Sequence, residues 1–437
     1  MKIQSQSKTN CSGKNHEQIS KLQHWVVLTI FGIAGLLSGC GGGSGSSGGP
    51  APVIDFSKKR AGDLAPDPTA VVPILEDRFT SGSVNPADFD YLEVDSPSMI
   101  EDASRPTADR YMLFYEATAG DGVNSIGLIS SDEYDFSTPI IDRTQVLQAS
   151  DLPQVEFIQT GELEDAVAVS DPSVIVDRSI APETAGRYRM WVEGVYGSAA
   201  NLSAILTCSS ADGVNWTPPQ LCEGFTLGPQ FGNVIRVVDA DVVYVGEAGE
   251  FARMIFEVTR SDQTSVFGMA TCNDPTGINW TVTDGVYIET EAAPVFSGGP
   301  GDFDSGSVRS PGLGIERDEI TGAIFKWHLF YEGKPADFVT NNDSVIGYSN
   351  SVDGYSWSGY AVPVITPTSD ILQPSAFDTD DVKHPDIYLR FSDDPNMDPL
   401  DPSYPPDLNR WVLYYSGDPE NVPAAEEVNR IGLGTAE

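Results

Sequence analysis

Basic residues are scarce in this chain. Its 437 residues contain only 25 Lys and Arg against 64 Asp and Glu, and the formal net charge is −39. A surface that binds a phosphate backbone needs a basic patch, so this balance excludes nucleic acid as a partner. The acidic residues are explained most simply as a solvated surface suited to a salty exterior. The alternative is that some of them bind Ca²⁺ or line a sugar site.

Long apolar runs are also missing, apart from one near the N-terminus. Residues 25–37 (WVVLTIFGIAGLL) are too short to span a bilayer comfortably and are typical of the apolar part of a signal peptide. A lysine-rich segment precedes them, and Leu-Ser-Gly-Cys follows, ending at Cys40. That ending resembles the bacterial lipobox, whose cysteine becomes lipidated. We therefore expect residues 1–39 to be a lipoprotein signal peptide, and residues 40–65, which begin CGGGSGSSGGP, to be a flexible tether.

The residue after Cys40 is Gly41 rather than Asp. By resemblance to Gram-negative lipoproteins, this favours the outer membrane. We predict a lipoprotein that faces the periplasm or the cell surface and contacts the membrane only through its lipid. An ordinary signal peptide with a coincidental cysteine is the alternative.

Cysteine is scarce as well, with five residues. Cys11 lies in the signal peptide and Cys40 is the predicted lipid site. Cys208 and Cys222 flank one turn, so neighbouring antiparallel strands could place them face to face. In an oxidising compartment this arrangement predicts a disulfide. Cys272 has no such partner and is predicted to be a free buried thiol.

What the chain does contain is a repeat of strand-like segments separated by some of its 42 glycines and 31 prolines. One copy, residues 171–216, reads DPSVIVD, then RYRMWVEG, then SAILTCSSADGVNW. The middle segment recurs five times with a polar residue at the same place. Those residues are Glu116, Glu193, Glu257, Glu332 and Ser416.

The repeat predicts an all-β fold. Three segments and a looser fourth make a four-stranded antiparallel sheet, and five such sheets arranged radially make a five-bladed β-propeller over residues 66–437. The last copy stops after its third strand. We expect residues 71–75 (VVPIL) to supply the missing strand and close the ring, because proteins avoid open sheet edges. A closed ring of this kind is expected to be a monomer.

Propeller geometry selects the residues that could carry chemistry. The first strand of each blade lines the central channel, and its start meets the end of the second strand at one rim. The Asp-Gly and Thr-Gly turns that precede Trp216, Trp280 and Trp357 fall at the opposite rim, where we interpret them as scaffold. The first rim collects one ring from the first strands: Asp95 and Ser96, Asp171, Asp239, Arg309 and Ser310, and Lys383 and His384.

The repeated glutamates form a second ring at the same rim. Crowded carboxylates push one another's pKa values apart, which is the condition for one acid and one base. The alternative is structural, with each Glu accepting backbone N–H bonds from the next blade.

These motifs resemble a known clan. First-strand Asp-Pro, then F-Y-E-G, then I-G-x-x-x-S-x-D-G-x-x-W is similar to the five-bladed propeller glycosidases, namely the arabinanases and xylosidases of glycoside hydrolase family 43 with the invertases and levansucrases. The likeness covers nearly all of residues 71–437. It implies one carboxylate from each of the first three blades. Asp95 and Asp171 fit the first two. Blade three offers Asp239 without the clan's Glu-Gly-Pro element, so Glu257 is the nearest substitute there.

The resemblance implies a glycoside hydrolase acting on a plant or algal polysaccharide outside the cell. Asp171 would be the base, Glu257 the acid, and Asp95 or Asp239 a third carboxylate. No cofactor is required. His384 resembles a channel histidine that lies near a bound cation, so Ca²⁺ in the channel stays open. The alternative is a non-catalytic surface propeller that binds a glycan or a protein. The residues expected to contact sugar are Glu116, Glu193, Arg309, Glu332 and His384.

Overall fold

The computed structural model describes residues 56–59, 73–76, 78, 80–83, 85–137, 143–157, 160–197, 202–225, 234–247, 249–262, 264–288, 303–318, 321–335, 344–360, 362–368, 376–389, 411–419 and 429–436. Within these ranges the regular structure is strand, with two short 3₁₀ turns, η1 (Thr107–Asp109) and η2 (Ala149–Asp151). None of the helices found there is long and apolar enough to cross a membrane. Cys40 lies outside the described residues.

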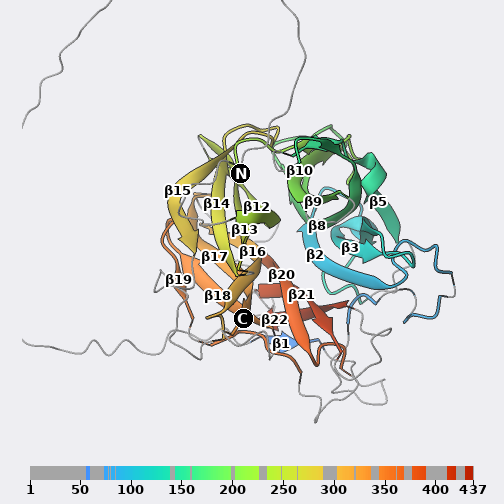
Figure 1. The fold of residues 1–437 in the computed structure, drawn as a ribbon. Coiled ribbons are helices and arrows are strands. Elements are labelled where there is room, and N and C mark those ends of the chain that lie inside the picture. The colour runs from blue at the N-terminus through green and yellow to red at the C-terminus, as the bar shows by residue number, and fades with distance from the viewer. Residues whose placement is uncertain are drawn as a thin grey trace, which may run out of the picture. The chain divides into compact units, whose positions relative to one another are not determined.

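The strands form five four-stranded antiparallel sheets (Figure 1). From the channel outward, blade one is β2 (Glu93–Glu101), β3 (Tyr111–Thr118), β4 (Asn124–Ser131) and β5 (Thr144–Gln148); blade two is β8 (Ala166–Val176), β9 (Tyr188–Tyr196), β10 (Leu202–Ser210) and β11 (Gln220–Leu221); blade three is β12 (Val234–Glu247), β13 (Glu250–Arg260), β14 (Ser265–Cys272) and β15 (Trp280–Ile288); blade four is β16 (Ser307–Arg317), β17 (Ile324–Lys334), β18 (Val345–Ser351) and β19 (Ser358–Gly359); blade five is β20 (Asp381–Leu389), β21 (Trp411–Asp418), β22 (Arg430–Ala436) and β1 (Ser57–Lys58). A small hairpin, β6 (Val155–Glu156) with β7 (Leu163–Glu164), precedes blade two.

The inner strands close into a ring. Each of β2, β8, β12 and β16 contacts the inner strand of the next blade, and β20 contacts β2. Apolar side chains fill the gaps, because a blade is apolar on both faces and needs a neighbour on each. Each of five core clusters spans one interface between adjacent blades. The predicted five-bladed propeller is confirmed.

The Asp-Gly-x-x-Trp turns are scaffold, as predicted. Gly213 has φ 73°, and a Cβ there would lie 2.4 Å from Met112 of the preceding blade. Trp216 donates from Nε1 to the Gly213 carbonyl over 3.1 Å, and its ring lies edge-on to Phe114 of blade one. The turn therefore packs one blade against the next.

An N-terminal segment completes the last blade, but the strand is not the predicted one. Ser57 and Lys58 pair with β22 as the outermost strand, inside the range predicted as tether. Of residues 71–75, Leu75 forms an isolated antiparallel bridge to Ile431. Both segments thus join β22. Lys58 secures the closure through an ion pair of 2.5 Å with Asp378, whose side chain is fully buried.

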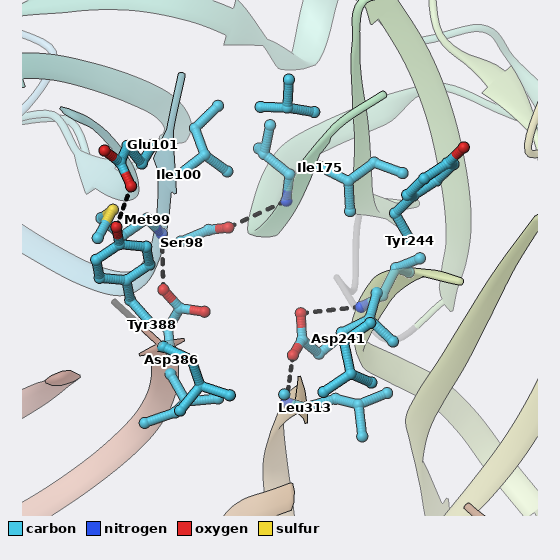
Figure 2. A pocket seen from close by; sticks show the side chains of 18 of the residues that line it. Ser98, Met99, Ile100, Glu101, Ile175, Asp241, Tyr244, Leu313, Asp386 and Tyr388 are labelled. Atoms are coloured by element: carbon cyan, nitrogen blue, oxygen red, sulfur yellow. Dashed lines mark hydrogen bonds between the residues drawn. The ribbon is translucent and has the colours of Figure 1, made fainter. Parts of the chain in front are cut away.

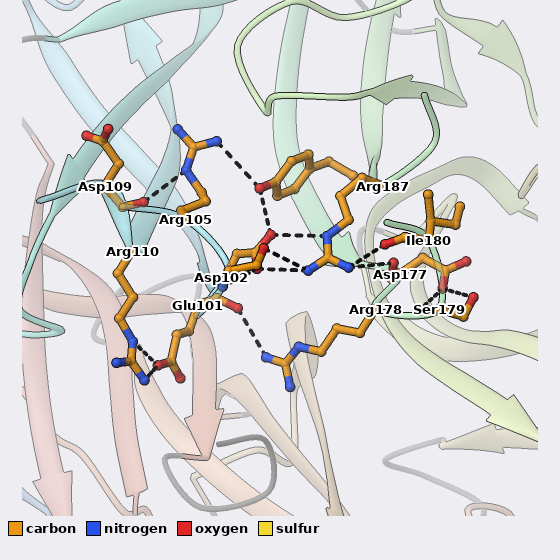
Figure 3. Close-up of polar contacts among 12 residues, drawn as sticks. Glu101, Asp102, Arg105, Asp109, Arg110, Asp177, Arg178, Ser179, Ile180 and Arg187 are labelled. Atoms are coloured by element: carbon orange, nitrogen blue, oxygen red, sulfur yellow. Dashed lines mark hydrogen bonds and ion pairs between the residues drawn. The ribbon is translucent and has the colours of Figure 1, made fainter. Parts of the chain in front are cut away.

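A second buried ion pair joins blades one and two (Figure 3). Arg187 donates from Nε and Nη2 to the two carboxylate oxygens of Asp102, over 3.1 and 2.8 Å. The Tyr188 hydroxyl also donates to Asp102, over 2.8 Å. Arg187 further donates to the Ile180 carbonyl over 2.6 Å. The pair is almost sealed from solvent, with side-chain exposures of 5% and 2%.

The predicted disulfide is wrong. Cys208, Cys222 and Cys272 are all free and buried, which confirms the prediction for Cys272. The register places Leu206 opposite Leu221, so Cys222 lies across from Ile205 and not from Cys208. Three residues of offset also turn the two thiols to opposite faces of blade two. Cys208 belongs to the core between blades one and two, and Cys222 to the core between blades two and three.

We expect reducing agent to leave the melting temperature unchanged, because no bond between Cys208 and Cys222 is there to be lost. A disulfide would contribute about 2–5 kcal/mol, and its reduction would lower the melting temperature by several degrees. Thermal unfolding with and without dithiothreitol measures this. Alkylation of the unreduced, denatured protein followed by mass spectrometry is the second readout. A peptide carrying Cys208 linked to one carrying Cys222 would contradict the expectation.

Candidate functional site

One backbone irregularity repeats in all five inner strands at the same height of the channel. Each strand has a β-bulge there, seen as a register shift against its neighbour. The bulged residue is in the left-handed region although it is not glycine, which costs roughly 1–3 kcal/mol at each position. Such strain is retained where surrounding structure fixes it, and it marks candidate functional sites. The five residues, with φ between 44° and 48°, are Ser96, Asp171, Asp239, Ser310 and His384.

The two predicted rings do meet at this rim. Asp95 pairs with Glu116, Ser170 with Glu193, and Arg309 with Glu332 across the first two strands of their blades. The same register relates Val238 to Glu257 and Lys383 to Ser416. The bulge then turns the next side chain of the inner strand toward the channel.

The structural interpretation of the second ring is confirmed at three positions. Glu116 accepts the backbone N–H of Asp171 over 3.4 Å, and Glu257 accepts that of Ser310 over 3.3 Å. Ser416 does the same for Ser96 over 3.2 Å. Each bond holds the strained bulge of the following blade.

Glu257 is further occupied by hydroxyl donors. The Ser265 hydroxyl donates to it over 2.6 Å and the Thr259 hydroxyl over 3.2 Å. With three donors directed at one carboxyl group, Glu257 serves as an acceptor that supports blade four. This arrangement suits a general acid poorly, because an acid must present its own proton to the substrate.

Asp171, Glu193 and Asp239 form the tightest acidic cluster of the rim. One carboxylate oxygen from each lies within 4.8 Å of the other two. The Ser96 hydroxyl donates to Asp171 over 2.7 Å, and Arg236 forms an ion pair of 2.7 Å with Glu193. The inner strands β8 and β12 and the second strand β9 thus bring together three residues that are far apart in the sequence.

The cluster holds protons at neutral pH. Burial raises the pKa of Glu193 to about 8, with the charge of Asp171 adding to the rise and that of Arg236 opposing it. Burial also raises the pKa of Asp239 well above its usual range, supported by the charges of Asp171 and Glu257 and by a hydrogen bond to Asp171. Three carboxyl groups in contact cannot all ionise. Glu193 and Asp239 are therefore the proton-bearing members.

Asp95 has the opposite environment. Its Oδ1 accepts a bond of 2.7 Å from His384 Nδ1, and its Oδ2 accepts one of 2.7 Å from Asn429. Burial alone would raise the pKa of Asp95, but the positive charges of His384 and Lys383 outweigh it and hold that pKa well below its usual range. Burial would lower the pKa of His384, yet Asp95 raises it to about 9. At neutral pH this is a buried ion pair.

The fourth blade contributes a mixed group. Glu332 lies opposite Arg309 in the register and 3.5 Å from Lys334. Glu332 and Asp95 also raise the pKa of Lys383 against the effect of burial. These residues surround the mouth with fixed charge of both signs, where sugar hydroxyls can find donors and acceptors.

The space enclosed by the five bulged residues is small. A cavity of about 40 Å³ is lined by all five of them and by Asp241 and Asp386 below. This holds about one water molecule, so a sugar ring must lie above the bulges. The oxygens of Asp171, Glu193 and Asp239 match the ligand preference of Ca²⁺, which takes roughly six to eight oxygens. Ca²⁺ in the channel stays a prediction.

Several partners at the rim were not predicted from the sequence. Arg236 lies two residues before Val238 on β12, on the same side of the strand, and that alternation was a usable signal. Asn429 precedes β22 and has no local motif that relates it to Asp95. Asn124, which donates to Glu116, is likewise visible only in three dimensions.

Comparisons with known proteins support the fold. No family model matches the chain, and no curated protein does. Among solved structures, a glycosyl hydrolase from Bacteroides ovatus is similar at a TM-score of 0.53 and 16% identity, over 87% of this chain and 93% of that one. The catalytic domain of the family 62 α-L-arabinofuranosidase of Coprinopsis cinerea is similar at 0.51 and 11%, over 88% and 97%. The α-L-arabinofuranosidase of Podospora anserina in complex with cellotriose gives the same values. At these identities the likeness shows a shared propeller fold with glycoside hydrolases.

Proposed function

We propose that this chain is a cell-surface, glycoside hydrolase-like propeller that acts on an extracellular polysaccharide or oligosaccharide, with a lipid on Cys40 as its membrane anchor. One observation carries the proposal. Carboxyl groups at one channel mouth have pKa values displaced in opposite directions, downward at Asp95 and upward at Glu193 and Asp239. Such a division is how a site holds a general base and a general acid at the same pH. The glycoside hydrolases that share the fold add support.

In this proposal Asp239 is the acid. It protonates the glycosidic oxygen as the bond from that oxygen to the anomeric carbon breaks. Asp95 accepts a proton from the water that adds to the anomeric carbon. Asp171 bonds to Asp239 and to the Ser96 hydroxyl, so it positions the acid and tunes its pKa. This assignment replaces Glu257 as the acid and moves the role of base from Asp171 to Asp95.

The test is a screen of the purified protein on aryl arabinofuranosides, aryl xylosides, fructans and plant or algal polysaccharides. We expect Asp239→Asn to lower kcat/KM by about 10²–10⁴-fold, the usual contribution of a general acid. Asp212→Asn, in a turn of the opposite rim, is the matched control and keeps wild-type activity. Activity of Asp239→Asn within a few-fold of wild type would refute the assignment.

One observation favours a non-catalytic glycan- or protein-binding propeller instead. Glu116, Glu257 and Ser416 support neighbouring blades, so much of the second ring serves the scaffold. In that case the wild type is as inert as Asp239→Asn on every substrate but still retains glycan in affinity electrophoresis. That pair of results would decide for binding.

A further inference from the structure

The central channel opens into a second and larger cavity, on the side opposite the carboxyl cluster. It measures about 390 Å³, within the range of roughly 300–1,000 Å³ typical of small-molecule sites. Its walls come from the later residues of all five inner strands, which run from the bulges toward the other rim. The lining includes residues 98–101 of β2, 174–176 of β8, 241–246 of β12, 313–315 of β16 and 386–389 of β20.

The cavity has aliphatic walls and an acidic floor (Figure 2). Ile100, Ile175 and Leu313 are among the wall residues. Asp241 and Asp386 form the floor, because they line both this cavity and the small one between the bulges. An apolar enclosure with a few convergent polar groups is the usual architecture of a ligand site.

The two floor carboxyl groups are held by neutral donors only. Asp241 accepts bonds from the Ser173 hydroxyl over 2.6 Å and the Val242 N–H over 2.9 Å, and from the Leu313 N–H. Asp386 accepts the Met99 N–H over 2.7 Å. Among the described residues, neither carboxyl group forms an ion pair. Two acidic groups therefore face an apolar space with no cation to balance them.

Burial opposes ionisation of both groups. It raises the pKa of Asp241 to about 6 and, with the charge of Asp241, the pKa of Asp386 well above its usual range. Other titratable or charged groups stand around them: Glu101, Arg178, Tyr244, Arg317 and Tyr388 line the same cavity, Tyr414 lies behind Asp386, and Asp171, Asp239 and His384 line the small cavity below.

The two arginines do not neutralise the floor. Arg317 donates to the backbone carbonyls of Tyr244 and Val245 over 3.0 and 2.7 Å, and Arg178 donates to the Glu101 carbonyl over 3.1 Å. Both lie where the inner strands end, at the open side of the cavity. A cation that reaches the floor would meet Asp241 and Asp386 and displace the proton held there.

We propose that this cavity binds a small organic cation, an ammonium group on an aliphatic body, with the ammonium between Asp241 and Asp386 and the hydrocarbon against the walls. The site is distinct from the carboxyl cluster of the opposite rim and does not depend on glycoside hydrolysis. The ammonium would supply the hydrogen-bond donors and charge that the floor lacks. Each methylene placed on the wall should improve affinity by about fourfold.

Calorimetric titration with n-hexylamine and n-hexanol tests the proposal on the full chain. At pH 8 hexylamine should bind at least about tenfold more tightly than hexanol, since hydrogen bonds to charged groups are the stronger ones. Near pH 5, where the floor is protonated, the advantage should disappear. Equal affinity of amine and alcohol at pH 8, or no binding of either, would overturn the proposal.

Two variants locate the binding. Asp386→Asn keeps an acceptor for the Met99 N–H, and it should weaken hexylamine by about tenfold or more while hexanol stays unchanged. Glu247→Gln removes one carboxylate from the exposed end of β12, outside the cavity, and should change neither ligand. Hexylamine binding that survives Asp386→Asn would place the amine elsewhere and contradict the proposal. The comparison of amine with alcohol in the wild type holds whatever the stability of the variant.

Discussion

Replacement of Lys58 by Met should lower the free energy of unfolding by about 3–5 kcal/mol, the usual cost of leaving a buried charge without its partner. Asp378 is fully buried, and Lys58 is its ion-pair partner at 2.5 Å. Lys58 also donates to the Thr366 carbonyl over 2.7 Å and the Thr368 hydroxyl over 3.0 Å. The Tyr415 hydroxyl, at 2.9 Å from Asp378, cannot balance the charge. Equilibrium unfolding in urea measures the loss.

Lys59→Met is the matched control for this result. Lys59 is adjacent and equally charged, but its ion pair with Asp135 spans 3.6 Å and is partly exposed on both sides. Exposed pairs contribute about 0–1 kcal/mol, so this variant should remain close to the wild type. Equal losses for the two lysines would mean that Lys58 closes the ring through its strand alone and that the ion pair adds nothing.

Replacement of Arg187 by Met should be similarly costly, by about 3–5 kcal/mol, because it leaves Asp102 buried between two blades. The effect should depend on pH. Burial would raise the pKa of Asp102, but bonds from Arg187, Ser104 and Tyr188 hold it well below its ordinary value of 3.8. A lowered native pKa gives stability that is present above pH 3.8 and lost as the pH falls below it.

Unfolding experiments at pH 7 and near pH 3 check both parts of this expectation. The stability difference between the wild type and Arg187→Met should be large at pH 7 and should shrink in acid, where Asp102 becomes protonated in the unfolded chain. Arg187→Met combined with Asp102→Asn should recover part of the loss at pH 7, because no buried charge is then left unpaired. A pH-independent difference would show that Arg187 acts through packing alone.

The repeat made the fold predictable. Middle strands ending at Glu116, Glu193, Glu257 and Glu332 have the same register in every blade, and that register follows from local alternation of side chains. The same argument placed both rings at one rim. It could not distinguish a carboxyl group that supports a bulge from one that holds a proton, since that depends on donors such as Ser265 from neighbouring strands.

The errors of sequence reasoning have equally physical causes. Cys208 and Cys222 are close along the chain, but a disulfide needs side chains on the same face, and an odd offset separates them. The closing strand was expected at residues 71–75 because VVPIL has strand-like composition. Ser57 and Lys58 carry no such pattern, and their position depends on the reach of one lysine to Asp378, 320 residues away.

The repeated bulges bear on how this architecture can change over time. At each of these five positions the backbone is fixed by its neighbours, and the side chain faces open space, not a packed core. Serine, aspartate and histidine already occupy equivalent places. A substitution there alters the chemistry of the mouth without disturbing the cores between the blades, and most destabilising mechanisms act through such cores. A lineage built on this propeller can therefore acquire or lose an activity by single exchanges while it keeps the same fold.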